Sequence, residues 1–146
     1  MVDKKNDSSK LSKQICFPLY AASRELIKRY RPFLDPIGIT YTQYITLLVL
    51  WDKKKVSVKD LGESLCLDSG TLTPVLKNLE SKGYVTRRRS TEDERVLVVT
   101  LTEEGEAMHD KVKSIPSQIA KTVSLDAEEL KTLTALLEKI LIENEQ

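Results

Sequence analysis

Segment 68–105 constrains the fold of this 146-residue chain most, because a helical hydrophobic period gives way there to two runs of β-prone residues. It opens with Asp68 and Ser69, residue types that cap helix N-termini, and apolar residues then recur at helical spacing until Gly83, which should end the helix. Two β-prone runs follow, separated by a polar, turn-prone stretch. The sequence therefore predicts a helix joined directly to a two-stranded hairpin. The apolar helix positions are Leu72, Val75, Leu76 and Leu79, and the strand runs are 84–89 and 96–101.

The opposite face of this predicted helix is polar. Its small or basic side chains can donate hydrogen bonds to base edges or phosphates without filling the major groove of DNA. A short helix followed at once by a basic hairpin is the arrangement of the DNA-reading half of a winged helix. Asn78 shares this face. We expect DNA contacts from Ser69, Thr71, Thr73 and Lys77 of the helix and from Arg87, Arg89, Asp93 and Arg95 of the hairpin.

Composition narrows the function classes. The net charge is only +1, so any attraction to nucleic acid must be local. Two cysteines without a signal peptide, and the lack of an apolar run of about 18 residues, favour a cytoplasmic protein without a membrane span. One histidine, His109, and no C-x-x-C pair predict no metal site. A Gly-rich phosphate loop and a nucleophile elbow are also missing, so we expect no cofactor and no enzyme.

The N-terminal part should be helical after a loose tail at 1–10. A first helix is expected over 11–34, and Thr40 should cap a second helix that runs through Leu50. A short third helix over 57–65 then leads into the turn before Ser69. One face of the first helix carries Cys16, Tyr20, Ser23, Ile27, Tyr30 and Leu34, and the break after it contains Asp35, Pro36 and Gly38.

The C-terminal part should form two helices. Thr102 should open the first, which Pro116 should bend, and Asp126 with Glu129 forms a capping-box pattern before the second. The apolar stripe of the last helix is wide, which favours packing on the first helix of a second subunit over packing on its own domain. The first stripe is Met108, Val112, Ile115 and Ile119, and the last is Leu130, Leu133, Leu136, Leu137, Ile140 and Leu141.

These elements predict a mainly α fold with a small β-hairpin wing. It is a winged helix-turn-helix with N- and C-terminal dimerisation helices, in one domain spanning 1–146. The DNA-binding part should cover about 41–101, and the dimerisation helices about 11–34 and 103–144. A homodimer would hold two reading helices about one helical turn of DNA apart, which suits double-stranded DNA with a pseudopalindromic operator.

The wing tip resembles the MarR family of bacterial transcriptional regulators. Asp93, Glu94 and Arg95 match the D-x-R signature of that family, and the sequence LTEEG at 101–105 opens the next helix as in its members. Segment 11–44 is similar to the organic-hydroperoxide-sensing, OhrR-like branch, and the similarity covers roughly 11–117. The resemblance implies a redox-sensing repressor that releases its operator when a cysteine is oxidised. Asn78 departs from the basic residue often found at its position in that branch.

Cys16 is the predicted sensing residue. From position alone, a cysteine on an apolar helix face is usually a small core residue. Tyr20 lies one helical turn after Cys16. Tyr30 lies about 21 Å from Cys16 along the axis of the first helix, at ~1.5 Å per residue, so it could reach only the Cys16 of a partner subunit. Tyr41, at the start of the second helix, could join Tyr30 there. In the OhrR-like branch, the matching tyrosines hydrogen-bond the sensing cysteine across the dimer. Phenol donors would stabilise a thiolate, which attacks peroxides. Ordinary interface packing is the alternative role of these tyrosines.

Cys66 should be a buried structural cysteine behind the helix-turn-helix. Two-cysteine members of the family carry their second cysteine after the wing, so the resemblance implies a one-cysteine sensor. Oxidised Cys16 would then need a small thiol, or further oxidation, to lock the change. The expected oxidant is an organic hydroperoxide. Three alternatives remain open: a broader oxidative-stress or virulence regulator, a thiol peroxidase, and a family member gated by aromatic acids in the dimer cleft.

Overall fold

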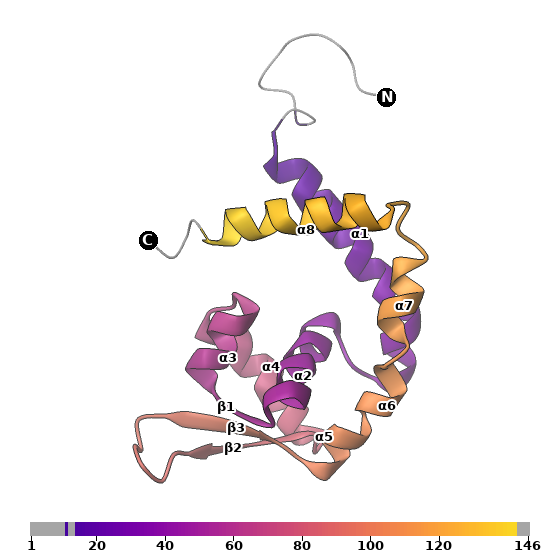
Figure 1. Cartoon of the computed structure of the whole chain (residues 1–146). Helices are drawn as coiled ribbons and strands as arrows, with labels where there is room; N and C mark the ends of the chain where they lie inside the picture. Colours follow the sequence, from indigo (N-terminus) through magenta and orange to yellow (C-terminus); the bar gives the residue numbers. More distant parts are fainter. Residues whose placement is uncertain (1–10, 12–13, 143–146) are drawn as a thin grey trace, which may run out of the picture. The chain divides into compact units, whose positions relative to one another are not determined.

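The computed structural model describes Leu11 and residues 14–142, so the tail expected at 1–10 and the predicted end of the last helix lie outside the described residues. The chain divides into two compact units, Met1–Ile115 and Pro116–Gln146. Figure 1 labels the elements along the chain. They are α1 (Cys16–Leu34), η2 (Asp35–Ile37), α2 (Tyr41–Lys53), β1 (Lys55–Ser57), α3 (Val58–Leu65), α4 (Ser69–Ser81), β2 (Val85–Arg89), β3 (Leu97–Leu101), α5 (Glu103–Ala107), α6 (His109–Val112), α7 (Ile115–Ala120) and α8 (Ala127–Ile142).

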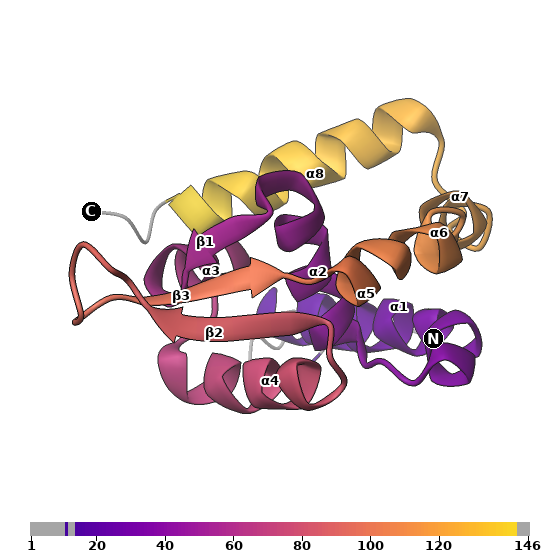
Figure 2. The ribbon, with the colours of Figure 1, turned by 90° about the horizontal axis from the view of Figure 1, so that it is seen from below.

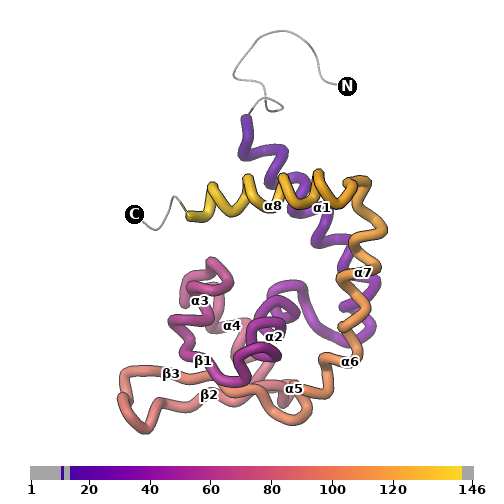
Figure 3. The backbone as a smooth tube through the Cα atoms, viewed as in Figure 1, coloured from indigo at the N-terminus to yellow at the C-terminus, as the bar shows by residue number. Residues whose placement is uncertain are grey.

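The chain turns by 77° between α1 with η2 and α2. α1 begins at Cys16, several residues later than predicted, and runs into the short helix η2. Gly38 then adopts a left-handed conformation with φ 72°, which glycine reaches without steric cost, and the path bends into α2 (Figure 3). Among the described residues, no single helix is long and apolar enough to cross a membrane. The segments Cys16–Ile37 and Tyr41–Lys53 pass that test only together, as a pair bent by 77°.

The first unit contains the predicted winged helix. Helices α2, α3 and α4 lie on one face of a three-stranded antiparallel sheet with strand order β1-β3-β2 (Figure 1). From below, the sheet lies in front of these helices, and α4 runs alongside β2 (Figure 2). The predicted hairpin is confirmed as β2 and β3, which pair from Val85–Leu101 to Arg89–Leu97. Strand β1, which pairs with β3 through Val56 and Val99, was not predicted.

Side-chain caps start the helices where the sequence predicted them. Thr40 accepts the Gln43 backbone N–H, and the Gln43 side chain accepts the Thr40 N–H in return, so α2 opens with a full capping box. Asp68 accepts the Thr71 N–H at 2.7 Å at the start of α4. Gly83, with φ 82°, follows the end of α4, as expected. Each cap satisfies a backbone donor that the first helical turn leaves open.

The core of the first unit lies between the helices and the sheet. Leu47 of α2, Leu61 of α3 and Leu72 of α4 are 0 % exposed, and Val99 of β3 closes the layer. Burial of each such side chain stabilises the fold by about 1.5–3 kcal/mol relative to leaving it exposed. The mainly α fold with a β-hairpin wing is therefore confirmed.

The segment after the wing differs from the single bent helix that we predicted. It forms α5, α6 and α7, so that prediction was wrong. Thr102 caps α5 as expected, since its hydroxyl accepts the Gly105 N–H at 3.1 Å. The break after α6 follows from Pro116, which has no backbone N–H and whose ring clashes with the carbonyl four residues earlier, at Val112, the last residue of α6.

The second unit contains α8. Asp126 accepts the Glu129 N–H at 2.8 Å and the Glu129 carboxylate accepts the Asp126 N–H at 2.9 Å, so the predicted capping box is confirmed. No α8 residue is buried within the chain. The apolar side chains that stay exposed are Leu130, Leu133, Leu136, Ile140, Leu141 and Ile142.

Candidate functional site

The outer face of α4 carries the residues predicted to read DNA. Ser69, Thr71 and Lys77 are exposed, whereas Leu72, Leu76 and Leu79 on the inner face are buried. Thr73 is half-buried, and its hydroxyl donates to the Ser69 carbonyl at 2.7 Å. Hydrogen bonds from Thr71, first that of its backbone N–H, hold the pKa of Asp68 below its usual value, so this cap stays ionised at neutral pH. Val75, which was also predicted to face inward, is half-buried like Thr73. The predicted faces of α4 are therefore confirmed for the three leucines and for Ser69, Thr71 and Lys77, whereas Thr73 and Val75 lie between the two faces.

The wing tip carries a fork between a carboxylate and a guanidinium. Arg95 donates to Asp93 from its backbone N–H at 3.0 Å, from Nε at 3.0 Å and from Nη2 at 3.1 Å. The hydrogen bond from the Arg95 side chain lowers the pKa of Asp93, and the same bond raises the pKa of Arg95. The Arg95 side chain nevertheless remains 89 % exposed. The guanidinium is therefore oriented by its own loop and still accessible to a ligand.

The two arginines predicted to bind DNA from β2 have different surroundings. Arg89 is exposed. The Arg87 side chain is only 17 % exposed and donates to the Glu80 carboxylate of α4 at 3.2 Å, and the Arg87 backbone N–H donates to the same carboxylate at 3.0 Å. These bonds, with the side-chain bond largest, lower the pKa of Glu80. Sequence reasoning missed Glu80, although opposite charges seven residues apart on either side of the Gly83 turn were a usable signal.

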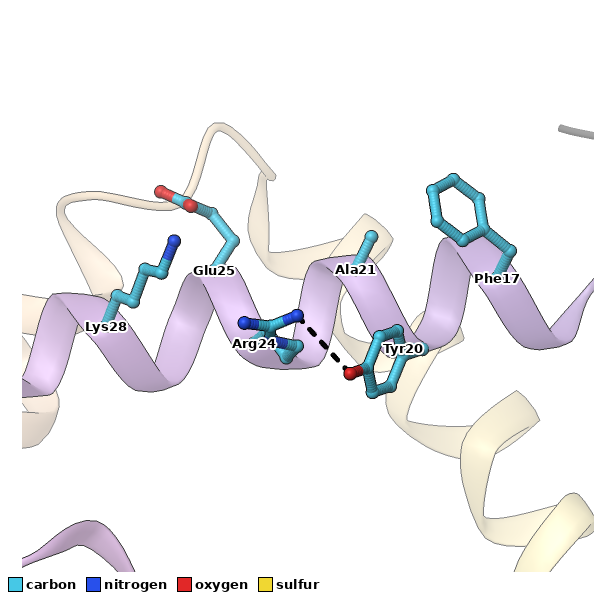
Figure 4. Close-up of a pocket in the computed structure, with 6 residues that line it drawn as sticks. All are labelled: Phe17, Tyr20, Ala21, Arg24, Glu25 and Lys28. Carbon is cyan, nitrogen blue, oxygen red and sulfur yellow. Dashed lines mark hydrogen bonds between the residues drawn. The ribbon is translucent and has the colours of Figure 1, made fainter. Parts of the chain in front are cut away.

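Cys16 lies exposed at the first position of α1, not in a core. Tyr20, one turn later, is 59 % exposed. Arg24 donates to the Tyr20 hydroxyl at 3.3 Å, and its guanidinium carbon lies 5.4 Å from the centre of the Tyr20 ring. Figure 4 shows this contact among the six residues that line a hollow of about 220 Å³, all of them from α1. Arg24 was missed, and its position four residues after Tyr20 was the signal.

Tyr30 and Tyr41 meet in a tyrosine cluster at the junction of α1 and α2. Their ring centroids are 4.9 Å apart, and Tyr44, which sequence reasoning had assigned only to the second helix, lies 5.7 Å from Tyr30. Burial raises the pKa of all three phenols, and the neighbouring rings add to this for Tyr30 and Tyr44. The phenols therefore stay protonated at neutral pH and can donate hydrogen bonds.

A cavity of about 370 Å³ lies beside the tyrosine cluster, where α1, η2 and α2 meet. Its walls combine aliphatic side chains with hydroxyls, one guanidinium and one carboxylate. The lining residues are Ile27, Arg31, Leu34, Asp35, Ile39, Thr40, Tyr41 and Thr42.

Cys66 does not have the buried position that we predicted. It is exposed and forms the C-cap of α3 in a left-handed conformation with φ 54°. The chain reverses there, and the Leu67 N–H donates to the Gly62 carbonyl at 2.9 Å. A Cβ at Gly62 would lie 2.8 Å from the Leu67 carbonyl oxygen, so this close approach requires glycine. The reversal turns Cys66 outward instead of into the core.

The part of the chain that the structure describes contains no group of three or more His, Cys, Asp or Glu residues that could hold a metal ion. His109, the single histidine, is an exposed residue of α6 whose ring lies 5.0 Å from that of Trp51 in an edge-on arrangement. The Trp51 indole in turn donates to the Gly105 carbonyl at 2.9 Å, so this end of α2 is fixed to α5.

Known proteins resemble the chain over nearly its whole length. Residues 23–112 match the family described as transcriptional regulator SarA/Rot, which is more than half of the chain. The organic hydroperoxide resistance transcriptional regulator of Bacillus subtilis is 47 % identical over 140 residues, covering 96 % of this chain and 95 % of that protein.

Solved structures agree with this match. Reduced AbfR bound to DNA aligns with a TM-score of 0.77 and 37 % identity, covering 93 % of this chain and 95 % of that one, and overoxidised AbfR bound to DNA aligns with a TM-score of 0.76 and 35 % identity. A MarR mutant from E. coli in complex with operator DNA aligns with a TM-score of 0.76 and 28 % identity over 96 % of this chain and 99 % of that one. The chain therefore belongs to the MarR-type and SarA/Rot-type family of winged-helix transcriptional regulators, in the branch of the organic hydroperoxide resistance regulators.

Proposed function

We propose that this regulator is a homodimeric repressor that binds a pseudopalindromic operator when Cys16 is reduced and releases it when an organic hydroperoxide oxidises Cys16. The observation that carries the proposal is the position of Cys16. It is exposed at the start of α1, the helix that leads through the tyrosine cluster into α2 of the winged helix. No cofactor takes part, and the protein acts in the cytoplasm.

The DNA-binding part of the proposal rests on two groups of polar side chains, all exposed except the half-buried Thr73, Arg87 and Asp93. The outer face of α4 supplies Ser69, Thr71, Thr73 and Lys77 to the major groove. The exposed and oriented Arg95 suits insertion into an adjacent minor groove, with Asp93 holding the guanidinium. Arg89 contacts phosphate, and Arg87 supports the wing through Glu80 more than it contacts DNA.

The homodimer rests on apolar surface that the chain leaves uncovered. Phe17 and Leu26 on α1 are 39 % and 36 % exposed, and all the apolar side chains named on α8 are at least 40 % exposed. An exposed apolar stripe of this kind favours burial against another copy. Helices near 11–34 and 103–144 supply this interface, and residues 41–101 form the DNA-binding part within one functional domain of 1–146. Across the interface, Tyr30 and Tyr41 of one subunit donate to the thiolate of the other.

The redox step balances without a cofactor. The Cys16 thiolate attacks a peroxide oxygen, so that an S–O bond forms, the O–O bond breaks and an alcohol leaves with the proton. The sulfur is oxidised by two electrons to a sulfenic acid, and the hydroperoxide is reduced. A small thiol then displaces water and leaves a mixed disulfide on Cys16, or further hydroperoxide carries the sulfur to a sulfinic acid. The bulkier, oxidised side chain no longer fits the tyrosine donors and changes the spacing of the two α4 helices.

A gel-shift on the DNA upstream of the chain's own gene, with and without cumene hydroperoxide, tests the proposal. Loss of the shift on oxidation, and its restoration by added thiol, would support it. A shift that survives complete oxidation of Cys16, verified by mass spectrometry, would reject it. A peroxidase would consume many equivalents of hydroperoxide per chain in the presence of thiol, so the stoichiometry separates that alternative.

A second candidate function is gating by an aromatic acid. The cavity beside Tyr41 favours it, because an aliphatic wall with Arg31 at its edge suits a small carboxylate with an apolar body. Titration of the same gel-shift with salicylate, in the absence of oxidant, distinguishes the two. Release by salicylate together with retention on oxidation would select the ligand-gated function. A regulon wider than hydroperoxide resistance would instead appear as further operators released by the same oxidation.

A further inference from the structure

The first turn of α2 contacts both the tyrosine cluster and the reading helix α4. On one side, the rings of Tyr41 and Tyr44 lie 4.9 and 5.7 Å from that of Tyr30 on α1. On the other side, Gln43 Nε2 donates to Asn78 Oδ1 of α4 at 2.6 Å. A single helical turn therefore touches the proposed sensor and the proposed DNA reader.

The side-chain amide of Gln43 has a fixed orientation. Its Oε1 accepts the Thr40 backbone N–H at 3.0 Å in the capping box, so its NH₂ group must point toward Asn78. Asn78 must then present its oxygen, and not its NH₂ group, to Gln43. Gln43 is only 5 % exposed, whereas Asn78 is exposed, so the bond is partly buried and is shielded from water on the Gln43 side. The contact holds α4 at a defined position relative to the start of α2.

A second contact ties the same face of α4 to the same segment. Lys82 Nζ donates to the carbonyl oxygen of Gly38, the left-handed residue between η2 and α2. Lys82 is the C-cap residue of α4, four residues after Asn78, so the two side chains lie on one side of the end of the helix. Two contacts one turn apart resist both rotation and sliding of α4 against the segment 38–43.

We propose that Gln43–Asn78 and Lys82–Gly38 are the connection through which a displacement of the tyrosine cluster reaches α4. This inference rests on the proposed function and adds to it a route from sensor to reader. Asn78 is accordingly a positioning residue that sets the orientation of α4, and not a base-reading residue. This role accounts for an asparagine at a position of the reading helix where a basic residue was expected from the resemblance.

The measured quantity is the release factor, the ratio of the operator Kd of the oxidised protein to that of the reduced protein. Fluorescence anisotropy on the upstream DNA gives both constants, and mass spectrometry verifies that Cys16 is fully oxidised in each sample. Asn78→Leu removes the acceptor without touching the capping box. Lys82→Met removes the second contact, and the double variant removes both.

Two further variants separate the connection from other roles. Asn78→Asp keeps an acceptor for Gln43 and should restore the release factor toward the wild-type value. Lys77→Met removes one positive charge from α4, as Lys82→Met removes one from its C-cap. It should weaken operator binding of the reduced and oxidised forms by the same factor and leave the release factor unchanged.

If the connection exists, the release factor of the double variant should be roughly 2- to 30-fold smaller than that of the wild type. Each single variant should show a smaller decrease, and Cys16 should oxidise at the wild-type rate in all of them. If the double variant unfolds in a thermal melt, the single variants carry the same test. If Asn78→Leu and Asn78→Asp each weaken operator binding of the reduced and the oxidised protein by the same factor, the proposal is overturned and Asn78 is a DNA contact. Wild-type protein that keeps its operator after oxidation would instead reject the proposed function itself, before any variant is compared.

Discussion

The Glu80 carboxylate of α4 accepts both the backbone N–H and the guanidinium of Arg87 in β2, at 3.0 and 3.2 Å. The reading helix and the wing are thus joined by one charged group at the point where the chain leaves α4. Arg87 is largely withdrawn from solvent by this contact. We infer that it aligns the wing with α4 before DNA arrives.

Glu80→Gln should lower the thermal stability of the protein at neutral pH, because the amide accepts more weakly from Arg87. Folding lowers the pKa of Glu80 from its ordinary value of 4.5. The Glu80–Arg87 pair therefore stabilises the fold fully at pH values above 4.5, and this stabilisation is lost as the pH falls through the lowered pKa of the folded state. The difference in Tm between wild type and variant should therefore shrink as the protein is acidified. Melting curves by circular dichroism from neutral to acid pH measure it, with Glu92→Gln as control. A difference independent of pH would contradict the pairing.

Arg95→Ala should weaken operator binding by about tenfold or more and flatten the salt dependence by about one unit of log–log slope, because an exposed cation at a groove is lost. Anisotropy titrations at several salt concentrations measure both effects. Glu94→Ala in the same loop is the control and should not weaken binding. If Asp93 and Arg95 only stabilise the loop, Tm falls and the slope stays as in wild type.

Thr73→Ala and Leu76→Ala test the two faces of α4. Thr73→Ala should change operator affinity with little loss of stability, since it removes one half-buried hydroxyl whose hydrogen bond goes to the Ser69 carbonyl of its own helix. Leu76 is 1 % exposed, so Leu76→Ala should cost about 2–5 kcal/mol of unfolding free energy. Urea denaturation and operator titration of both variants measure these effects. The reverse pattern would mean that the faces are wrongly assigned.

Tyr30→Phe should leave operator binding intact and slow the oxidation of Cys16. The ring still packs on Tyr41, but one phenol donor to the thiolate is lost. Tyr44→Phe, in the same cluster, is the matched control and should oxidise at the wild-type rate. Stopped-flow oxidation with cumene hydroperoxide followed by thiol quantification measures the rates. Equal rates for wild type and Tyr30→Phe would show that this tyrosine only packs.

Local chemistry made much of the fold predictable from sequence. Thr40, Asp68, Thr102 and Asp126 each carry a side-chain oxygen at the start of an apolar period, and all four accept a backbone N–H as caps. Because a cap and the helix it starts lie within a few residues of each other, the sequence alone contains both partners. The hairpin was predictable for the same reason, because its two β-prone runs and the turn-prone stretch between them are neighbours in the sequence.

Contacts between distant segments were not predictable in the same way. Strand β1 is three residues long and depends on pairing with β3, more than 40 positions later, so Lys55–Ser57 showed no pattern of its own. Cys66 is exposed because the chain reverses in a left-handed conformation at the end of α3. The spacing of apolar residues in the sequence does not predict such a reversal. The same holds for Gln43 and Asn78, 35 residues apart, whose hydrogen bond appears only when α2 packs on α4.

The central claim is that Cys16, and not Cys66, is the sensing thiol. Operator release against cumene hydroperoxide concentration for wild type, Cys16→Ser and Cys66→Ser, with mass spectrometry to locate the modified sulfur, tests it most directly. The account predicts that Cys16→Ser binds operator and keeps it at every hydroperoxide concentration. Cys66→Ser should release operator as wild type does, with the added oxygen or thiol adduct on Cys16. An insensitive Cys66→Ser variant, or an adduct found on Cys66 of the wild type, would contradict the account.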